Sequence, residues 1–212
     1  MNKETLIEVH NRIKPFIHKT PVLSSSLINE MVGANVVFKC ENFQKAGAYK
    51  IRGATNAILK LSEKERSKGV VTHSSGNFAQ AVSLAAKNLG VPAYIVMPTN
   101  APKIKKSGTI SYDGIITECE PTIAARERES SKIQQETGAS FLHPSNDIDV
   151  ILGNSTIGTE LLKEFPDYKI TESYSQLSSI ISKLNLYNKD FKDDAKIEYN
   201  LNENIGRIKN SI

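Results

Sequence analysis

Short apolar runs alternate with helical patterns along most of the chain. Each run has four or five residues, and all but the last are rich in valine and isoleucine, which is typical of buried strands. Two of the helical patterns end at Gly90 and Gly138, and glycine is a common helix stop. Strands and helices that alternate with short loops predict an α/β fold, in which helices cover parallel sheets. The predicted strands are 36–40, 70–73, 93–97, 115–119 and 140–143, and the predicted helices between them are 52–61, 77–89, 103–107 and 121–137.

Further helical patterns lie toward the two ends of the chain. An amphipathic pattern runs over residues 6–13, and Pro15 should stop that helix. A second pattern covers 156–165. Residues 174–187 carry one apolar helical face, so we expect an amphipathic helix there. Residues 188–212 have mixed charge and few large apolar groups, and we expect them to be poorly ordered.

Composition and charge exclude several classes of protein. The chain has 212 residues, 39% hydrophobic and 24% charged, which predicts a globular protein with a substantial core. Its net charge of +4 (27 − 23) comes without the concentrated basic face that nucleic-acid binding requires. Two cysteines are too few for a disulfide framework or a full zinc site. No run approaches the roughly 20 apolar residues of a membrane span, and the polar N-terminus lacks a signal-peptide pattern, so we expect a cytoplasmic protein.

Lys50 is the first candidate for chemistry. It lies in a short polar loop between the predicted strand 36–40 and the predicted helix 52–61, with Gly47 before it and Gly53 after it. The positive end of a helix dipole disfavours a cation, so this position favours the neutral amine, the form that attacks a carbonyl. Residue chemistry alone leaves the ordinary alternative open, which is an exposed or salt-bridged lysine.

The loop Ser74-Ser75-Gly76-Asn77 also stands between a strand and a helix. It can be a capping turn, in which side chains satisfy the first backbone amides of the helix. It can equally be a cradle in which amides and hydroxyls bind a carboxylate or a phosphate. Because the carboxyl ends of parallel strands meet at one edge of a sheet, we expect this loop and Lys50 to share a pocket.

Several motifs occur together in a fixed order along the chain. They are Gly-Ala-Tyr-Lys-Ile-Arg-Gly-Ala (47–54), Ser-Ser-Gly-Asn-Phe-Ala-Gln (74–80), Val-Pro-Ala-Tyr-Ile-Val-Met-Pro (91–98), Ala-Pro-Lys (101–103), Cys-Glu-Pro (119–121) with Arg126, and His-Pro (143–144). From about residue 5 to residue 166, the chain resembles the serine racemase and serine/threonine dehydratase (threonine ammonia-lyase) family. These are pyridoxal phosphate enzymes of fold type II, with the tryptophan synthase beta-like two-domain fold.

The resemblance implies pyridoxal 5'-phosphate as the cofactor. Lys50 would form the Schiff base with it and move the α-proton on one face of the substrate. Tyr49 fills the aromatic position before the lysine, where the family usually has Ser-Phe rather than Ala-Tyr. Asn77 matches the asparagine that hydrogen-bonds the ring oxygen of the cofactor.

The resemblance also implies an amino-acid substrate, L-serine or L-threonine. Ser74, Ser75, Gly76 and Asn77 would hold its carboxylate, and Arg126 would be a further contact. Racemases of the family place a serine acid/base at the position of Ser75, on the opposite face of the substrate, so racemase activity is expected to be possible. β-Elimination of water with release of ammonia is the commoner activity of the family.

The resemblance divides the chain into parts of two domains. Residues 1–60 and 145–168 correspond to part of the large, cofactor-binding domain, and 61–144 to the small α/β domain. In the family, a strand and a glycine-rich run that cradles the cofactor phosphate follow the last matched helix. Residues 169–212 do not match and contain one glycine, Gly206.

Two kinds of function are therefore open. One is an active ammonia-lyase or racemase, which would act as a homodimer. The other is a truncated, inactive remnant, or a non-catalytic interaction protein that uses segment 174–187 as its partner surface. We assign no metal-binding residue, because the metal site of the family lies in the part that is not matched. Neither nucleic acid nor a membrane is an expected partner.

Overall fold

A computed structural model of the chain describes residues 3–166. The chain divides into two units, one of residues 1–23 and 37–168 and the other of residues 24–36 and 169–212. The amphipathic helix predicted over residues 174–187 and the poorly ordered segment predicted over residues 188–212 lie outside the described residues. The boundary predicted between the large and small domains stays a prediction.

Helix α2 (Ser26–Val32) is the regular element described in the second unit. Ser25 caps it, because its side chain accepts a hydrogen bond from the amide of Ile28. Gly33 ends the helix in the left-handed conformation, with φ of 67°. The short helix therefore follows from a serine cap and a glycine stop.

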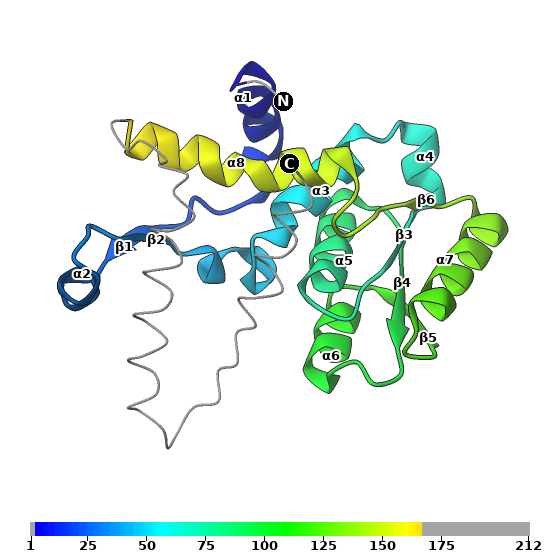
Figure 1. The fold of residues 1–212 in the computed structure, drawn as a ribbon. Helices are drawn as coiled ribbons and strands as arrows, with labels where there is room; N and C mark the ends of the chain where they lie inside the picture. The colour runs from blue at the N-terminus through cyan, green and yellow to red at the C-terminus, as the bar shows by residue number, and fades with distance from the viewer. Residues whose placement is uncertain (1–2, 167–212) are drawn as a thin grey trace. The chain divides into compact units, whose positions relative to one another are not determined.

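Four parallel strands form one sheet of the first unit, in the order β5-β4-β3-β6 (Figure 1). Their β-branched side chains pack well on a pleated surface. Parallel neighbours need crossover connections, which the helices between the strands supply. The predicted parallel α/β sheet is confirmed, although its last strand ends two residues earlier than predicted. The strands are β3 (Val70–His73), β4 (Ala93–Pro98), β5 (Ile115–Cys119) and β6 (Ser140–Phe141).

Helices cover both faces of this sheet. In Figure 1, α5 (Asn77–Leu89) and α6 (Lys103–Ser111) lie on one side of the strands, and α7 (Ile123–Thr137) lies on the other. Helix α7 begins at Ile123, two residues later than predicted, because Thr122 is its N-cap residue and Pro121 lies outside the helix. The Thr122 hydroxyl accepts a backbone hydrogen bond from the first turn and so caps the helix.

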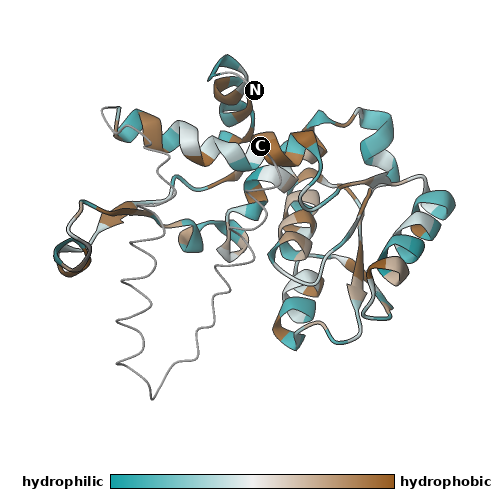
Figure 2. Cartoon of the chain, viewed as in Figure 1, coloured by the Kyte–Doolittle hydropathy of each residue, from teal (hydrophilic) through white to brown (hydrophobic). Residues whose placement is uncertain are grey.

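Alternate residues of the strands contribute to two separate hydrophobic cores. In β4, Ile95 and Met97 pack on the side of α5, whereas Val96 packs on the side of α7. All three side chains are fully buried. In Figure 2, β4 is coloured as hydrophobic and helix α4 (Glu63–Lys68) as hydrophilic. The sheet is thus buried on both faces, as parallel sheets generally are.

Three more helices, α1 (Lys3–Ile13), α3 (Lys50–Lys60) and α8 (Ile148–Glu164), pack together, and α3 also contacts α5. Glycine permits the contact between α3 and α8, because a Cβ at Gly53 would lie 2.6 Å from the carbonyl oxygen of Val150. Helix α8 begins at Ile148 instead of the predicted residue 156. The reason is a local cap that the prediction did not use, in which the Asp147 carboxylate accepts from two amides of the first turn.

The chain between α1 and α3 is built from short elements. Strands β1 (Val22–Ser24) and β2 (Val37–Lys39) form a two-stranded sheet. Three short 3-10 helices, at Lys14–Phe16, Glu41–Phe43 and Lys45–Gly47, turn the chain, and the first contains Pro15, as expected for the end of α1. The last two lead from β2 directly into α3.

Candidate active site at the start of helices α3 and α5

The turn before Lys50 has an unusual backbone. Ala46 (φ 59°) and Gly47 (φ 69°) are both left-handed, and an alanine in this conformation is strained. The buried side chain of Gln44 holds the turn. Its Oε1 accepts from the amides of His18 (2.8 Å) and Lys45 (2.9 Å), and its Nε2 donates to the His18 carbonyl oxygen (2.8 Å). The sequence did not mark Gln44, because its partner His18 lies far back in the chain.

Lys50 is the first residue of α3, two residues before the predicted start, and it is half-buried. Its Nζ donates to the Pro144 carbonyl oxygen (3.1 Å). The same nitrogen lies 5.2 Å from the ring centroid of Tyr49 and 5.9 Å from that of Phe78. Within residues 3–166, no carboxylate lies within ion-pair distance of this amine. The salt-bridged alternative therefore does not describe Lys50.

The carbonyl that Lys50 contacts belongs to a turn held by His143. The Nδ1 atom of His143 accepts hydrogen bonds from the amides of Ser145 (3.1 Å) and Asn146 (2.8 Å). The imidazole also stacks edge-on with the ring of His73, at a centroid distance of 5.9 Å. His143 thus links the end of β3 to the turn that carries Pro144.

The loop 74–76 joins β3 to α5 without a side-chain cap. The amide of Ser74 donates to the Val96 carbonyl oxygen (3.1 Å), which fixes the loop to the sheet edge. The Ser74 hydroxyl accepts only a long bond, 3.4 Å, from the amide of Gly76. Gly76 stands at the N-cap without a side-chain hydrogen bond, and a Cβ there would meet nothing within 4 Å. Of the two interpretations of this loop, the open amides favour the anion cradle.

Asn77 is bound from a direction that the sequence did not indicate. Its Oδ1 accepts from Nζ of Lys105 in α6 (2.6 Å), and the same ammonium donates to Oε1 of Gln80 (3.1 Å). Lys105 therefore adds positive charge at the start of α5. The cluster of lysines after Pro102 was the available signal, but only the packing of α6 against α5 directs one of them to Asn77.

Arg126 lies in α7, on the other face of the sheet. It is half-buried, and its Nε is buried without a hydrogen-bond partner within residues 3–166. Burial, the nearby His143 and the positive charge of Arg126 lower the pKa of His73, and burial has the largest effect. Arg126 is thus close enough to act electrostatically on the end of β3. A buried guanidinium nitrogen without a partner is rare and suits an anionic ligand.

A buried ion network fixes the start of α3. Arg52 donates to both oxygens of Glu41 (2.7 and 2.8 Å) and to Glu160 Oε1 (2.7 Å). Lys39 Nζ pairs with the other oxygen of Glu160 (2.6 Å). Burial opposes the charge of Arg52, but the hydrogen bonds to the two carboxylates outweigh it and raise the pKa of the guanidinium. The network joins α3 to β2, to the turn after β2 and to α8. Its central residue, Arg52, lies two residues after Lys50.

The predicted site residues are gathered only in part. The contact of Lys50 with Phe78 places the amine beside the start of α5, and the pocket expected for Lys50 and the loop 74–77 stays a prediction. A cavity of about 1000 Å³ lies elsewhere, between α1 and α8, and no predicted site residue lines it. Within residues 3–166, no group of three or more His, Cys, Asp or Glu side chains could hold a metal ion. The roles assigned to the individual site residues stay predictions.

These residues fit part of an anionic cofactor that carries a carbonyl. Lys50 offers an amine between two aromatic rings, and the open amides of α5 and the Arg126 guanidinium offer positions for anions. A glycine-rich phosphate cradle is not found among residues 3–166. The fold is a parallel α/β fold, and the site offers a lysine amine to which a carbonyl cofactor could be joined.

Comparisons with known proteins name the family. Residues 13–173 match the pyridoxal-phosphate dependent enzyme family, and the chain belongs to it. It is 47% identical to serine racemase of Arabidopsis thaliana over 190 residues, which are 90% of this chain and 57% of the relative. It is 49% identical to beta-hydroxyaspartate dehydratase of Paracoccus denitrificans over 161 residues, which are 76% of this chain and 51% of the relative. The structure of maize serine racemase matches with a TM-score of 0.77 at 45% identity, over 89% of this chain and 57% of that one.

The match confirms the predicted family, fold class and cofactor class. Pyridoxal phosphate is the cofactor of the family to which the chain belongs. The chain spans about half the length of the curated relatives it matches. None of the helices formed by residues 3–166 is long and apolar enough to cross a membrane.

Proposed function

We propose that the chain carries the catalytic lysine of a pyridoxal phosphate-dependent enzyme for β-hydroxy amino acids, acting as an ammonia-lyase (dehydratase) or as a serine racemase. The observation that carries the proposal is the half-buried Lys50 amine, which has no carboxylate partner among residues 3–166 and lies beside the open start of α5. The names of the relatives, serine racemase and beta-hydroxyaspartate dehydratase, support this class of substrate.

The residues around Lys50 divide the work of binding the cofactor and the substrate. When bound, pyridoxal phosphate draws electrons from the α-carbon of the substrate. Lys50 Nζ would hold the cofactor before the substrate binds and, once the substrate amine has replaced it there, would take the α-proton, while Tyr49 would shield one side of the amine. Asn77 hydrogen-bonds the ring oxygen of the cofactor. The loop Ser74-Ser75-Gly76-Asn77 binds the substrate carboxylate at the uncapped start of α5.

The outcome of the reaction depends on Ser75 and on the β-hydroxyl. If the Ser75 hydroxyl returns a proton to the opposite face of the α-carbon, the product is the other enantiomer. If the β-hydroxyl leaves as water, the products after hydrolysis are a 2-oxo acid and ammonia. Arg126 is a further substrate contact, and its unpaired Nε favours a second carboxylate, as in 3-hydroxyaspartate.

Purified protein should be titrated with pyridoxal phosphate and followed by the visible absorbance of the lysine-bound cofactor. Oxo-acid release from L-serine, L-threonine and 3-hydroxyaspartate, and D-serine formation, should then be measured. Lys50→Ala should abolish the absorbance band and lower turnover by about 10²–10⁴-fold, whereas Lys60→Ala, at the exposed end of the same helix, should change neither. Ser75→Ala should remove racemisation and keep elimination, and an equal loss of both would contradict its role.

A non-catalytic protein is the second candidate function, favoured by the single glycine in residues 169–212. It predicts a flat visible spectrum with pyridoxal phosphate and no turnover of any of the three substrates. We also propose that the active form is a homodimer, by analogy with its family. Sedimentation of the cofactor-loaded protein measures this, and a monomer with full turnover would contradict it.

A further inference from the structure

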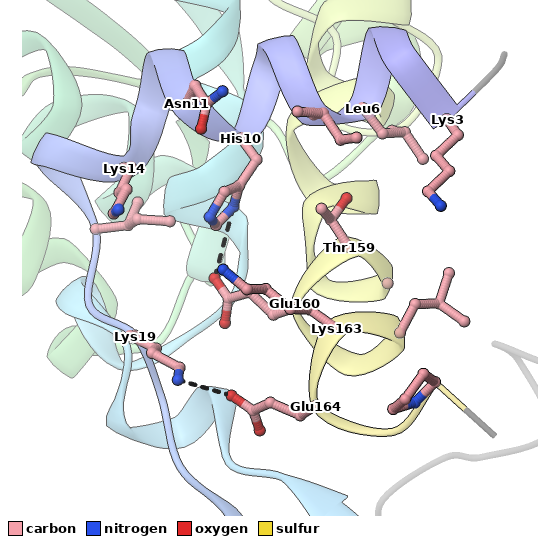
Figure 3. Close-up of a pocket in the computed structure, with 15 residues that line it drawn as sticks. Lys3, Leu6, His10, Asn11, Lys14, Lys19, Thr159, Glu160, Lys163 and Glu164 are labelled. Carbon is pink, nitrogen blue, oxygen red and sulfur yellow. Dashed lines mark ion pairs between the residues drawn. The ribbon is translucent and has the colours of Figure 1, made fainter. Parts of the chain in front are cut away.

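One peptide group stands between His143 and the Lys50 amine. It joins Pro144 to Ser145, in the turn between β6 and α8. Its carbonyl oxygen accepts a hydrogen bond from Lys50 Nζ (3.1 Å), and its amide donates to Nδ1 of His143 (3.1 Å). This turn is separate from the cavity between α1 and α8, whose wall contains none of these residues (Figure 3).

The planarity of this peptide group makes its two hydrogen bonds depend on each other. In a trans peptide, the C=O and N–H bonds lie in one plane and point in opposite directions. When the Ser145 amide points at the His143 ring, the Pro144 oxygen must therefore point away from that ring, and Lys50 Nζ lies on this side. The orientation of the imidazole thus determines where the amine finds its acceptor.

The sheet holds the His143 ring in place. Strands β3 and β6 are parallel neighbours, so His73 and His143 lie side by side where the two strands end. The His143 ring stands edge-on to the rings of His73 and Phe141, at centroid distances of 5.9 and 6.1 Å. The carbonyl oxygen of Leu142, the residue before it, accepts from the Thr72 hydroxyl (2.7 Å). The imidazole is therefore positioned by β3 and β6, independently of the turn that it holds.

Nδ1 of His143 is the acceptor of both backbone bonds. A backbone amide can only donate, and Nδ1 receives the amides of Ser145 and Asn146 (2.8 Å). The neutral ring then carries its proton on Nε2, whereas an imidazolium has a proton on each nitrogen and could not make these bonds. Because hydrogen bonds in a chain polarise one another, the bond at the Ser145 amide also makes the Pro144 oxygen a better acceptor.

We propose that His143 is a positioning residue for Lys50 and acts through the carbonyl oxygen of Pro144. By turning this oxygen toward Nζ, it holds the amine between the rings of Tyr49 and Phe78, whose centroids are 5.2 and 5.9 Å from the nitrogen. The use of this hold in a reaction rests on the proposed function, whereas the hold itself does not.

The test measures how fast acetic anhydride labels Lys50 in the cofactor-free protein. Mass spectrometry gives this rate relative to that of Lys60, the exposed lysine at the end of the same helix. The amine must leave the Pro144 oxygen to meet the reagent, so a weaker hold means faster labelling. His143→Asn keeps an acceptor at the place of Nδ1, because Oδ1 is equally far along the side chain, and should label as wild type does. His143→Gln carries its oxygen one bond further out and should label Lys50 about three- to tenfold faster, the factor expected for one hydrogen bond.

Three results would overturn the proposal. They are equal labelling of Lys50 in all three proteins, faster labelling in His143→Asn as well as in His143→Gln, and ring nitrogen resonances of wild type that place the proton of neutral His143 on Nδ1. The resonances need no variant, so they decide even where circular dichroism shows that His143→Gln does not fold.

Titration with pyridoxal phosphate separates this proposal from the proposed function. If wild type gives no visible band, the proposed function fails, and the labelling of the cofactor-free proteins still decides the role of His143. If the band forms, His143→Gln should need about three- to tenfold more cofactor for half of it, because its amine is not held in one place. His143→Asn should need the same amount as wild type, and a weakening equal to that of His143→Gln would contradict the role of the Nδ1 acceptor.

Discussion

Replacing Arg52 by methionine tests the ion network that holds the start of α3. The Arg52 side chain is 0% exposed, and its partners Glu41 and Glu160 are 12% and 5% exposed. Methionine keeps much of the aliphatic volume but leaves both carboxylates without their shared partner. Removing one member of a buried ion pair costs about 3–5 kcal/mol. That is a large part of the roughly 5–15 kcal/mol that stabilises a typical domain.

Urea unfolding at pH 7 measures this loss. With a slope of about 2 kcal/mol per molar urea, the midpoint should fall by about 1.5–2.5 M. The control is Arg128→Met, because Arg128 is 64% exposed and pairs with the adjacent Glu129 at 3.4 Å. The free energy of unfolding of this control should change by less than about 0.5 kcal/mol. Equal midpoints for the two variants would refute the energetic role of the network.

Acid should reduce the difference between wild type and Arg52→Met. Burial acts to raise the pKa of Glu160, but the hydrogen bonds from Arg52 and Lys39 outweigh it, so the pKa lies below its ordinary value of 4.5. A carboxyl with a lowered folded-state pKa stabilises the fold above its unfolded pKa, and this contribution is lost as the pH falls through the folded value. The difference should therefore be full at pH 7 and smaller at about pH 3. A difference that does not change with pH would contradict the assignment to Glu160.

Two further substitutions test packing and pH dependence. Gly53→Ala should destabilise the fold by about 1–3 kcal/mol, because the new Cβ would lie 2.6 Å from the Val150 carbonyl oxygen. Gly158→Ala in α8 should stabilise the fold by about 0.5–1 kcal/mol, because a Cβ there meets nothing within 4 Å. Thermal unfolding measures both changes, and changes of the same sign would contradict the close contact between α3 and α8. Burial lowers the pKa of His73 below 6.5, so its contribution to stability is complete above pH 6.5 and is lost as the pH falls through the lowered value. His73→Phe, which keeps a ring against Phe141, should lose less stability than wild type between pH 7 and 5 in urea titrations, and identical losses would show that His73 does not titrate in this range.

Sequence patterns predicted the sheet and most helices because those signals are local. The apolar runs became strands β3 to β5 almost residue for residue, and Gly90 and Gly138 ended their helices as predicted. The two helix starts that the prediction missed also depend on local signals. A capping box at Ser62 and Glu65 begins α4, and the Asp147 cap moves the start of α8 forward to Ile148. Both signals were present in the sequence, but the periodicity of apolar residues outweighed them.

The candidate site was predicted less completely than the fold. Motif resemblance selected Lys50 and the loop 74–77, and the structure places the Lys50 amine beside Phe78 at the start of α5. Motif resemblance did not select Lys105, whose ammonium binds Asn77, or Gln44, whose side chain holds the turn before Lys50. Their hydrogen-bond partners are 28 and 26 residues away in the chain, so no short motif contains both members of either pair.

The sequence by itself determined the α/β class, the parallel sheet and the family, because strand and helix periods and family motifs are properties of short segments. Only the tertiary structure decided how Lys50 is bound. Its amine meets a carbonyl 94 residues away, and the neighbouring Arg52 meets Glu160, 108 residues away. The Arg52–Glu160 pair forms because packing α3 against α8 removes both charges from water, and a buried charge without a partner lowers stability. That requirement acts across the fold and leaves no periodic trace in the chain.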